Sequence, residues 1–231
     1  MVSEVTSMMN RLHVLVIGPG LGRCPLVLEA TSRIIRECQT YKVPLIVDAD
    51  ALYLFSLPPY RRLLLDTKLE APVVLTPNAM ERKRMQESLE EYWNENIEND
   101  ESTNGCLIVI EKGQYDVIKP YPTTTSSSSS NNNNNVITCG EVGGLKRCGG
   151  LGDLLAGSLG TVIAWNNILT TRGVASSKDL SLACWAACCF VKRSTNRAYH
   201  QHRRSMTAPD VLAALGPTID EMTTTEPESK L

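Results

Sequence analysis

Several features that define specialised classes of protein are scarce in this sequence. Across 231 residues no apolar run approaches the roughly 18 residues that a membrane-spanning helix needs. Residues 1–11 contain neither the apolar core nor the cleavage site of a secretory signal. The formal charge is only −2, from 23 Lys and Arg against 25 Asp and Glu, so no bulk charge attracts nucleic acid or an anionic bilayer. We therefore expect a cytoplasmic protein that binds neither nucleic acid nor a membrane.

The eight cysteines also lack a pattern that would indicate a metal site or a disulfide framework. They are scattered through apolar stretches, and no CxxC pair occurs among them. We expect buried, reduced thiols. With 42% apolar and 21% charged residues, the composition is that of an ordinary globular domain and excludes collagen, a coiled coil and wholesale disorder.

Short runs of β-branched residues alternate with longer helical stretches along most of the chain. This alternation predicts an α/β fold with a mainly parallel sheet and crossover helices. The chain opens almost directly into its first predicted strand. We expect strands at 12–18, 43–48, 72–76 and 107–111, a hairpin pair at 115–120 and 136–139, and helices at 26–41, 79–93, 153–165, 180–199 and 208–215.

Two segments have compositions that cannot bury apolar surface. Residues 123–135 are a tract of Thr, Ser and Asn, which we expect to be a disordered loop inserted between the two hairpin strands. Residues 223–231 are a polar tail of the same kind. The remainder, 1–222, is expected to be a single domain.

Two polar or glycine-rich segments follow the first two predicted strands. The first, Gly18-Pro-Gly-Leu-Gly22, either brings backbone amides close to an anion or is only a tight turn, and it lacks the GxGxxG spacing of a dinucleotide fingerprint. The second contains Asp48 and Asp50, which either face a ligand in the crevice at the sheet edge or, in the case of Asp50, cap a short helix over 51–55.

The next two segments have a structural and a functional interpretation as well. Asn78 and Glu81 have the spacing of a capping box, although the same groups are suited to a hydrated magnesium ion. Lys112 lies in a Lys-Gly-Gln-Tyr-Asp segment that either contacts a nucleotide phosphate or forms a plain hairpin turn.

The segment from Gly143 to Asp153 is the most informative. It has five glycines within ten residues and leads directly into a predicted helix, but it lacks the Gly-Lys-Ser/Thr ending of a Walker A loop. Free amides and the dipole at a helix N-terminus favour the charge that develops on a transferring phosphoryl group. Asp153 in the first turn is placed to accept a proton from a substrate hydroxyl, or only to cap the helix.

The order of these segments resembles one known family. GPGLGR, VDADAL, LTPNxxE, EKGxxD and GGLKRCGGxGDLLAGSLG occur in the order found in the ATP-dependent NAD(P)H-hydrate dehydratases, repair enzymes of the ribokinase-like superfamily. The resemblance covers residues 12–215. It implies a three-layer α/β fold with a mainly parallel central sheet. It also implies that ATP phosphorylates the hydroxyl of hydrated NADH or NADPH, after which elimination of phosphate restores the dinucleotide.

The resemblance assigns roles to matching positions, with ATP and Mg²⁺ as the implied cofactors. Asp153 would contact the substrate and act as the base. The hydrated dinucleotide would also contact Gly20, Asn78, Ala79, Met80, Glu81, Arg82, Lys83 and Arg84. No residue is assigned as a direct metal ligand, with Asn78 and Glu81 as candidates acting through water. ATP would be held by Lys112, Gly113, Gln114, Tyr115, Asp116, Gly143, Gly144, Leu145, Lys146, Arg147, Cys148, Gly149, Gly150, Leu151 and Gly152.

Other functions stay open at this point. A vitamin-alcohol kinase of the same superfamily would use the same anion site and base, and a nucleotide-binding form without turnover is a further alternative. A Rossmann dehydrogenase fits less well because the glycine spacing is wrong. Family members usually carry a further N-terminal portion, so we expect a truncated domain, with a mitochondrial form where a longer N-terminus exists. The sequence leaves homo-oligomerisation open.

Overall fold

The computed structural model describes residues 1–224 apart from five gaps, at 65–68, 86, 88–106, 121–135 and 175–179. The predicted disordered tract at 123–135 and most of the predicted polar tail lie outside the described residues. The helix predicted at 79–93 is described as helical over 79–85 and at 87, and the rest of it falls in a gap.

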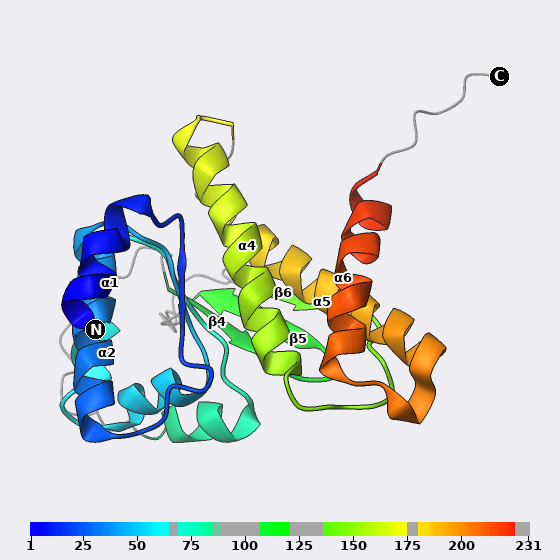
Figure 1. The fold of residues 1–231 in the computed structure, drawn as a ribbon, viewed down its shortest axis with the longest axis horizontal. Helices are drawn as coiled ribbons and strands as arrows, with labels where there is room; N and C mark the ends of the chain where they lie inside the picture. The colour runs from blue at the N-terminus through cyan, green and yellow to red at the C-terminus, as the bar shows by residue number, and fades with distance from the viewer. Residues whose placement is uncertain (65–68, 86, 88–106, 121–135, 175–179, 225–231) are drawn as a thin grey trace, which may run out of the picture.

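A six-stranded sheet forms the centre of the fold (Figure 1). Its strands lie in chain order, β1 to β4 are parallel, and β5 pairs antiparallel with both β4 and β6. The predicted mainly parallel sheet and the hairpin are thereby confirmed. The strands are β1 (Leu15–Ile17), β2 (Leu45–Val47), β3 (Val73–Leu75), β4 (Leu107–Glu111), β5 (Asp116–Pro120) and β6 (Ile137–Cys139).

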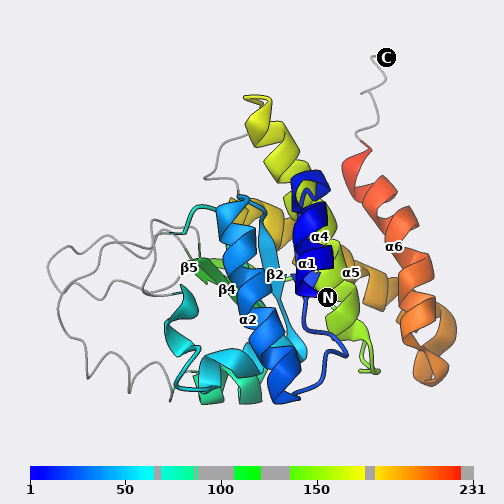
Figure 2. The ribbon, with the colours of Figure 1, turned by 60° about the vertical axis from the view of Figure 1, so that its left-hand side comes forward.

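Helices cover both faces of the sheet, as Figures 1 and 2 show from two directions. On one face lie α1 (Val2–Met8) and α2 (Pro25–Thr40), and on the other lie α4 (Leu151–Thr171) and α5 (Leu180–His202), with α6 (Ala208–Thr223) packed against α5. Short 3₁₀ segments are η1 (Met9–Arg11), η2 (Ala49–Ser56), η3 (Arg61–Leu64) and η6 (Arg203–Ser205).

The central strands are buried on both faces, which explains their continuous β-branched composition. Leu45 and Val47 of β2 pack with α2, whereas Ile46 between them packs with Leu159 and Ile163 of α4. Successive side chains of a strand point to opposite faces, so each strand contributes to two separate apolar layers.

The expectation that the chain opens almost directly into its first strand is wrong. Helix α1 and segment η1 precede β1, and Met9 of η1 is fully buried. Val2 and Val5 also pack against the same apolar cluster. The spacing of these three residues by three and four positions is the helical signal that identifies this segment.

The expectation of buried thiols holds for most, but not all, of the described cysteines. Cys24 is exposed and Cys148 is half-buried, because both lie in loops at the edge of the sheet. The other five are buried, and all seven described cysteines are free. Burial raises the pKa of Cys38 and of Cys184 to about 12, so these two are neutral thiols.

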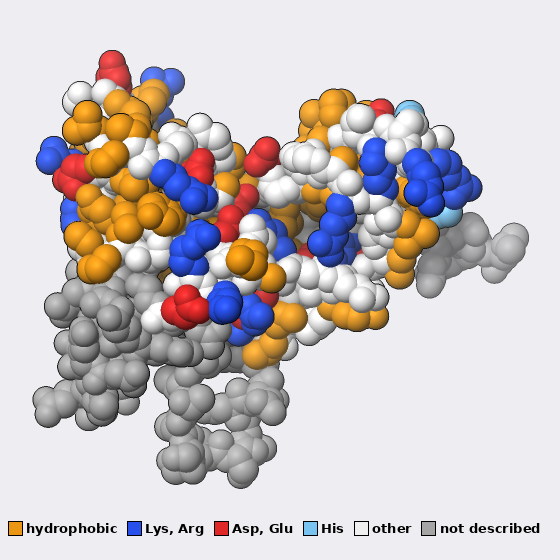
Figure 3. Space-filling model, turned by 90° about the horizontal axis from the view of Figure 1, so that it is seen from below, with side chains coloured by type: hydrophobic (Ala, Val, Ile, Leu, Met, Phe, Trp, Pro, Cys, Tyr) orange, Lys and Arg blue, Asp and Glu red, His pale blue; other side chains and the backbone are white. Residues whose placement is uncertain are grey.

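Loops at one edge of the sheet bring the sequence-predicted segments together. Strands β1 to β4 are parallel, and β6 runs in the same direction because it is antiparallel to β5. Their carboxyl ends therefore share one edge, which Figure 3 views directly and where acidic and basic side chains gather. The crevice at such an edge is the usual ligand site of an open α/β sheet. No helix in the described part of the chain is long and apolar enough to cross a membrane.

Candidate functional site

The loop after β1 depends on a glycine at its first position. Gly18 has a φ of +128°, and a β-carbon there would collide with the carbonyl group of Asp48 at the end of β2. Gly20 and Gly22 also have positive φ values, but open space surrounds both. The loop is therefore held close to β2 at its start and exposed toward its tip.

Asp50 holds this loop and does not cap its own segment. Its Oδ2 accepts a hydrogen bond from the Gly22 amide at 3.0 Å, and its Oδ1 accepts one from Arg23 Nε at 2.9 Å. The segment that follows β2 is the 3₁₀ helix η2, for which Asp48 is the N-terminal residue without a side-chain cap. The alternative in which Asp50 caps a helix over 51–55 is therefore wrong.

Asp48 and Lys112 form an ion pair across the sheet edge. Lys112 Nζ donates to Asp48 Oδ1 at 2.8 Å, and the two side chains are only 20% and 3% exposed. A β-carbon on Gly152 would lie 3.6 Å from Asp48 Oδ2 and 3.7 Å from Lys112 Nζ. The start of α4 therefore lies directly on this pair, which joins β2 and β4 beneath it.

Asn78 and Glu81 form the predicted capping box at the start of the helix over 79–85. Asn78 Oδ1 accepts from the amides of Met80 and Glu81 at 2.9 and 3.0 Å, and Glu81 Oε2 accepts from the Asn78 amide at 2.8 Å. The structural interpretation is confirmed, and these oxygens are already engaged. One turn along, Arg82 pairs with Glu111 at 3.1 Å, which ties this helix to the end of β4.

The hairpin turn between β4 and β5 is held by a hydrogen bond within the turn and by contacts from α5. Asp116 Oδ1 accepts from the Gly113 amide at 2.9 Å, closing the turn. Lys192 Nζ of α5 donates to the carbonyls of Gly113 and Gln114 at 3.0 and 2.9 Å and lies 3.4 Å from Asp116 Oδ2. The predicted nucleotide-contacting turn is therefore a rigid hairpin, with Lys112 at its start.

The glycine-rich segment runs from β6 along α5 to α4. The Gly144 amide donates to Thr195 Oγ1 at 3.1 Å, and Lys146 Nζ donates to the Met206 carbonyl at 2.7 Å. Gly150, with a φ of +88°, is the N-cap of α4 and supplies no side-chain cap. Within the described ranges no acceptor is found for the amides at 151–153, the first turn of α4.

Asp153 lies in that first turn, at the third helical position. Its side chain is exposed and makes no hydrogen bond or ion pair with the residues that the structure describes. The carboxylate does not act as a helix cap, so its capping interpretation is wrong for this structure. Without a partner among the described residues, it lies beside amides that favour a negatively charged ligand.

The donor set at this edge does not form a protein cage for a metal ion. Asp48, Asp50 and Glu81 each have a partner from the chain, as described above. No group of three or more His, Cys, Asp or Glu side chains arranged to hold a metal occurs among the described residues.

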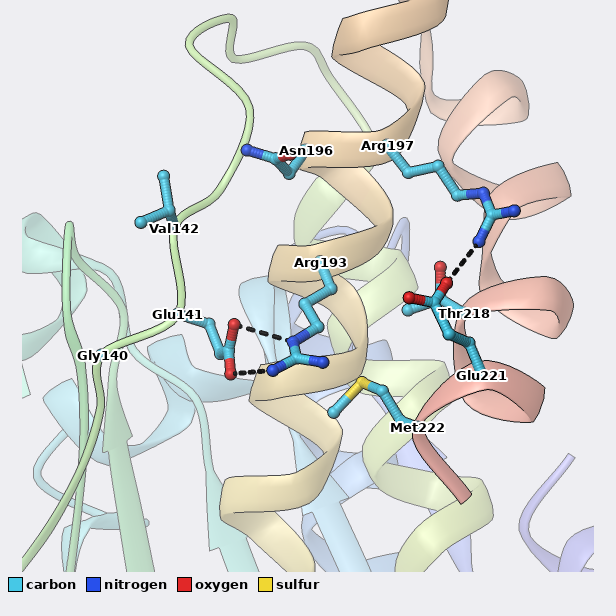
Figure 4. Close-up of a pocket in the computed structure, with 9 residues that line it drawn as sticks. All are labelled: Gly140, Glu141, Val142, Arg193, Asn196, Arg197, Thr218, Glu221 and Met222. Carbon is cyan, nitrogen blue, oxygen red and sulfur yellow. Dashed lines mark hydrogen bonds and ion pairs between the residues drawn. The ribbon is translucent and has the colours of Figure 1, made fainter. Parts of the chain in front are cut away.

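A hollow of about 630 Å³ is lined by the segment that follows β6 and by helices α5 and α6 (Figure 4). None of the sequence-predicted site residues lines it. Arg193 of α5 bridges to Glu141 at 2.8 and 2.9 Å, and Arg197 pairs with Glu221 of α6 at 2.9 Å. The residues that line the hollow are Gly140, Glu141, Val142, Arg193, Asn196, Arg197, Thr218, Glu221 and Met222.

The structure thus brings all five predicted segments to one edge, but their polar groups have different partners. Lys112 and Gly152 meet at Asp48, whereas the oxygens of Asn78 and Glu81 are used within their own helix start. Sequence reasoning missed Lys192, which lies 79 residues after the carbonyl that it contacts. No local sequence signal identifies such a partner.

Comparison with solved structures defines the class of fold. The chain is similar to a hypothetical protein from Streptococcus mutans, with a TM-score of 0.65 at 16% identity over 96% of this chain and 71% of that one. It is also similar to a ribokinase-like superfamily protein from Enterococcus faecalis V583, with a TM-score of 0.56 at 17% identity over 94% and 66%. The fold is ribokinase-like.

Sequence comparison then identifies the family. The model of the carbohydrate-kinase family described as NAD(P)H-hydrate dehydratase matches residues 1–216, so the chain belongs to this family. Proteins named ATP-dependent (S)-NAD(P)H-hydrate dehydratase from Mus musculus and Nematostella vectensis are 31% and 32% identical over 97% and 96% of this chain. These matches cover 62% and 59% of those proteins, so the chain spans about three-fifths of their length.

Proposed function

We propose that this chain catalyses the ATP-dependent dehydration of the S form of hydrated NADH or NADPH. The observation that carries the proposal is the start of α4. Gly150 supplies no side-chain cap to the first-turn amides, and Asp153 has no partner among the described residues. Membership in the dehydratase family supports the choice of substrate.

The start of α4 has the chemistry required to hold the phosphates of ATP. Free amides and the positive end of the helix dipole attract an anion. Gly152 lacks a side chain that would stand between the phosphate and Lys112 Nζ. Phosphoryl transfer depends mostly on positioning and on electrostatic stabilisation, which these groups supply without a covalent intermediate on the protein.

Asp153 is proposed to accept the proton of the ring hydroxyl as that oxygen attacks the terminal phosphate of ATP. ADP leaves as the phosphoryl group is transferred. The bond between the ring carbon and the oxygen then breaks, the phosphate leaves with its electron pair, and the adjacent ring carbon loses a proton as the ring double bond forms. The products are NADH or NADPH, ADP and inorganic phosphate. A positioned general base contributes about 10²- to 10⁴-fold to the rate of such a step.

Magnesium is proposed to be held chiefly by the phosphate oxygens of ATP. The carboxylates of Asp48 and Asp50 are engaged with the chain itself, and Mg²⁺ commonly keeps several waters while binding substrate phosphates. Asn78 and Glu81 would reach such an ion only through water.

The hollow beside Gly140–Val142 is the proposed place for the base of ATP. It adjoins Gly143, the first residue of the glycine-rich segment, and its volume of about 630 Å³ is within the usual range for ligand pockets. Met222 offers an apolar surface, and Asn196 an amide that hydrogen-bonds to a heterocycle (Figure 4).

The test is the recovery of dihydronicotinamide absorbance when the purified chain meets hydrated NADH, Mg²⁺ and ATP, with ATP omitted as the control. ATP-dependent recovery with release of free phosphate is expected. Accumulation of a phosphorylated alcohol in place of NADH would favour a vitamin-alcohol kinase. ATP binding without any turnover would favour the catalytically silent form.

A further inference from the structure

Arg23 is held in a fixed position directly after the glycine loop. Its Nε donates to Asp50 Oδ1 at 2.9 Å, while the other oxygen of Asp50 accepts from the Gly22 amide at 3.0 Å. One carboxylate thus fixes both the loop and the guanidinium group. No acceptor for the two terminal nitrogens of Arg23 is recorded within the described part of the chain, and the side chain is 48% exposed.

The ring of Tyr53 supports Arg23 and a second arginine. Arg23 Cζ lies 4.8 Å from the ring centroid, and Arg84 Cζ lies 5.9 Å from it. Both distances are within the range of a cation–π interaction. Arg23 follows β1, Tyr53 lies in η2 after β2, and Arg84 lies in the helix after β3. The segments that follow three neighbouring strands therefore place two guanidinium groups at one tyrosine.

The cluster of Arg23, Tyr53, Arg84 and Asp50 has a surplus of positive charge. Asp50 neutralises one guanidinium group, and no carboxylate among the described residues pairs with Arg84. The neighbouring Arg82, by contrast, is neutralised by Glu111 at 3.1 Å. Two cations at one ring repel each other, so an anion bound there is stabilised. The planar guanidinium fork matches the geometry of a phosphate.

We propose that Arg23, positioned by Asp50 and Tyr53, binds a phosphate group of the dinucleotide together with Arg84. The inference rests on the proposed function, which supplies the dinucleotide. With the reacting ring at Asp153 on α4, the rest of that long ligand extends along the edge toward the loops after β1 to β3. Its pyrophosphate and, in NADPH, its 2′-phosphate share the chemistry that this cluster recognises.

The test compares Arg23→Gln with Arg33→Gln, a matched removal of an arginine that pairs with Glu29 on the exposed side of α2. A hydrogen bond to a charged group is stronger than a neutral one, so KM should rise about tenfold or more in Arg23→Gln while kcat changes little. A rise in KM for hydrated NADPH alone would identify the 2′-phosphate as the group that Arg23 binds. A rise in KM for both substrates would identify the pyrophosphate. Arg33→Gln should leave both constants unchanged.

Thermal unfolding of both variants, together with Arg23→Lys, separates binding from folding. Arg23→Lys keeps the charge and loses the fork, so its KM should lie between those of the wild type and Arg23→Gln. An unchanged KM for both substrates in a folded Arg23→Gln protein would overturn the inference. A fall in kcat at constant KM would overturn it as well.

Calorimetric titration with NAD⁺ and NADP⁺ in the absence of ATP distinguishes this inference from the proposed function. Weaker binding to Arg23→Gln in a protein that shows no dehydration would support the phosphate site and contradict the dehydratase. Active wild-type protein whose Arg23→Gln variant binds both nucleotides with unchanged affinity would retain the dehydratase and overturn the phosphate site.

Discussion

Two helices begin at the same edge of the sheet, and their first turns are built in opposite ways. In the helix over 79–85, the side chains of Asn78 and Glu81 accept hydrogen bonds from the amides of Asn78, Met80 and Glu81. These amides are therefore not available to a ligand. In α4, Gly150 takes the same position without a side-chain cap, and the first-turn amides find no acceptor among the described residues. A helix start that carries its own cap is structural, whereas one that lacks a cap and is preceded by glycines has the capacity to bind an anion.

The largest effect is expected from Asp153→Asn at the uncapped start. Turnover should fall about 10²- to 10⁴-fold because the general base is lost, while ATP affinity is retained. Steady-state recovery of dihydronicotinamide absorbance gives the rate, and calorimetry gives the ATP affinity. Asp210→Asn, which alters a capping carboxylate at the start of α6, is the control and should leave turnover unchanged. Full activity of Asp153→Asn would remove Asp153 from the mechanism.

Lys112→Met tests the support beneath the uncapped start. It leaves the Asp48 carboxylate, whose side chain is 3% exposed, buried without its partner, and the free energy of unfolding should fall by about 3 kcal/mol. The double variant Asp48→Asn/Lys112→Met removes the stranded charge and should recover most of this loss. Denaturant unfolding of the wild type and the two variants gives the comparison, and equal losses in the single and double variants would contradict the account.

Gly150→Ala tests the backbone conformation that starts α4. The φ of +88° disfavours any other residue, and the new β-carbon would lie 3.0 Å from Ala208 Cβ, so unfolding should become easier by about 1–2 kcal/mol. Gly149→Ala is the matched control, because nothing lies within 4 Å of a β-carbon there. Similar thermal midpoints for the two variants would show that the conformation at 150 carries no special requirement.

Asn78→Ala tests the capped start, where the expected effect is on stability. Loss of an N-cap side chain costs about 1 kcal/mol, and denaturant unfolding measures it. The dependence of turnover on magnesium concentration should stay unchanged, since the Asn78 oxygen is already engaged with the amides of Met80 and Glu81. A large shift in the magnesium requirement would instead support the water-mediated metal role of Asn78.

The smallest effect concerns the capping box of α6, the third helix start that is compared. Hydrogen bonds from Thr207 lower the pKa of Asp210 below its ordinary value of 3.8. The carboxylate therefore contributes stability above that pH, and the contribution is lost as the pH falls through the lowered pKa. The difference in thermal midpoint between wild type and Asp210→Asn should shrink in acid. A constant difference would show that the charge of Asp210 makes no contribution.

Much of the fold was predictable from the sequence because its signals are local. The central strands are buried on both faces, which requires the continuous β-branched runs that mark β2 and β3. Helix α1 was missed although its apolar residues have helical spacing. The capping box of Asn78 and Glu81 was also predictable from the sequence, since its partners lie three residues apart.

The candidate site was only partly predictable because its partners lie far apart along the chain. Asp50 bonds Gly22 across 28 positions, and Lys112 bonds Asp48 across 64. The packing of the loops at the sheet edge determines which side chains bond to distant residues. It also determines which side chains stay available to bind a ligand. Asp50 is engaged, whereas Asp153 has no partner among the described residues, and their sequence contexts do not distinguish the two.

The most direct test of the contrast between the two helix starts is calorimetric titration of ATP with Mg²⁺ into Gly150→Ala and Asn78→Ala side by side. If the uncapped start of α4 holds the phosphates, Gly150→Ala should bind ATP about tenfold or more weakly, and Asn78→Ala should bind it like the wild type. Unchanged affinity in folded Gly150→Ala, or a loss confined to Asn78→Ala, would contradict the assignment of the phosphates to α4.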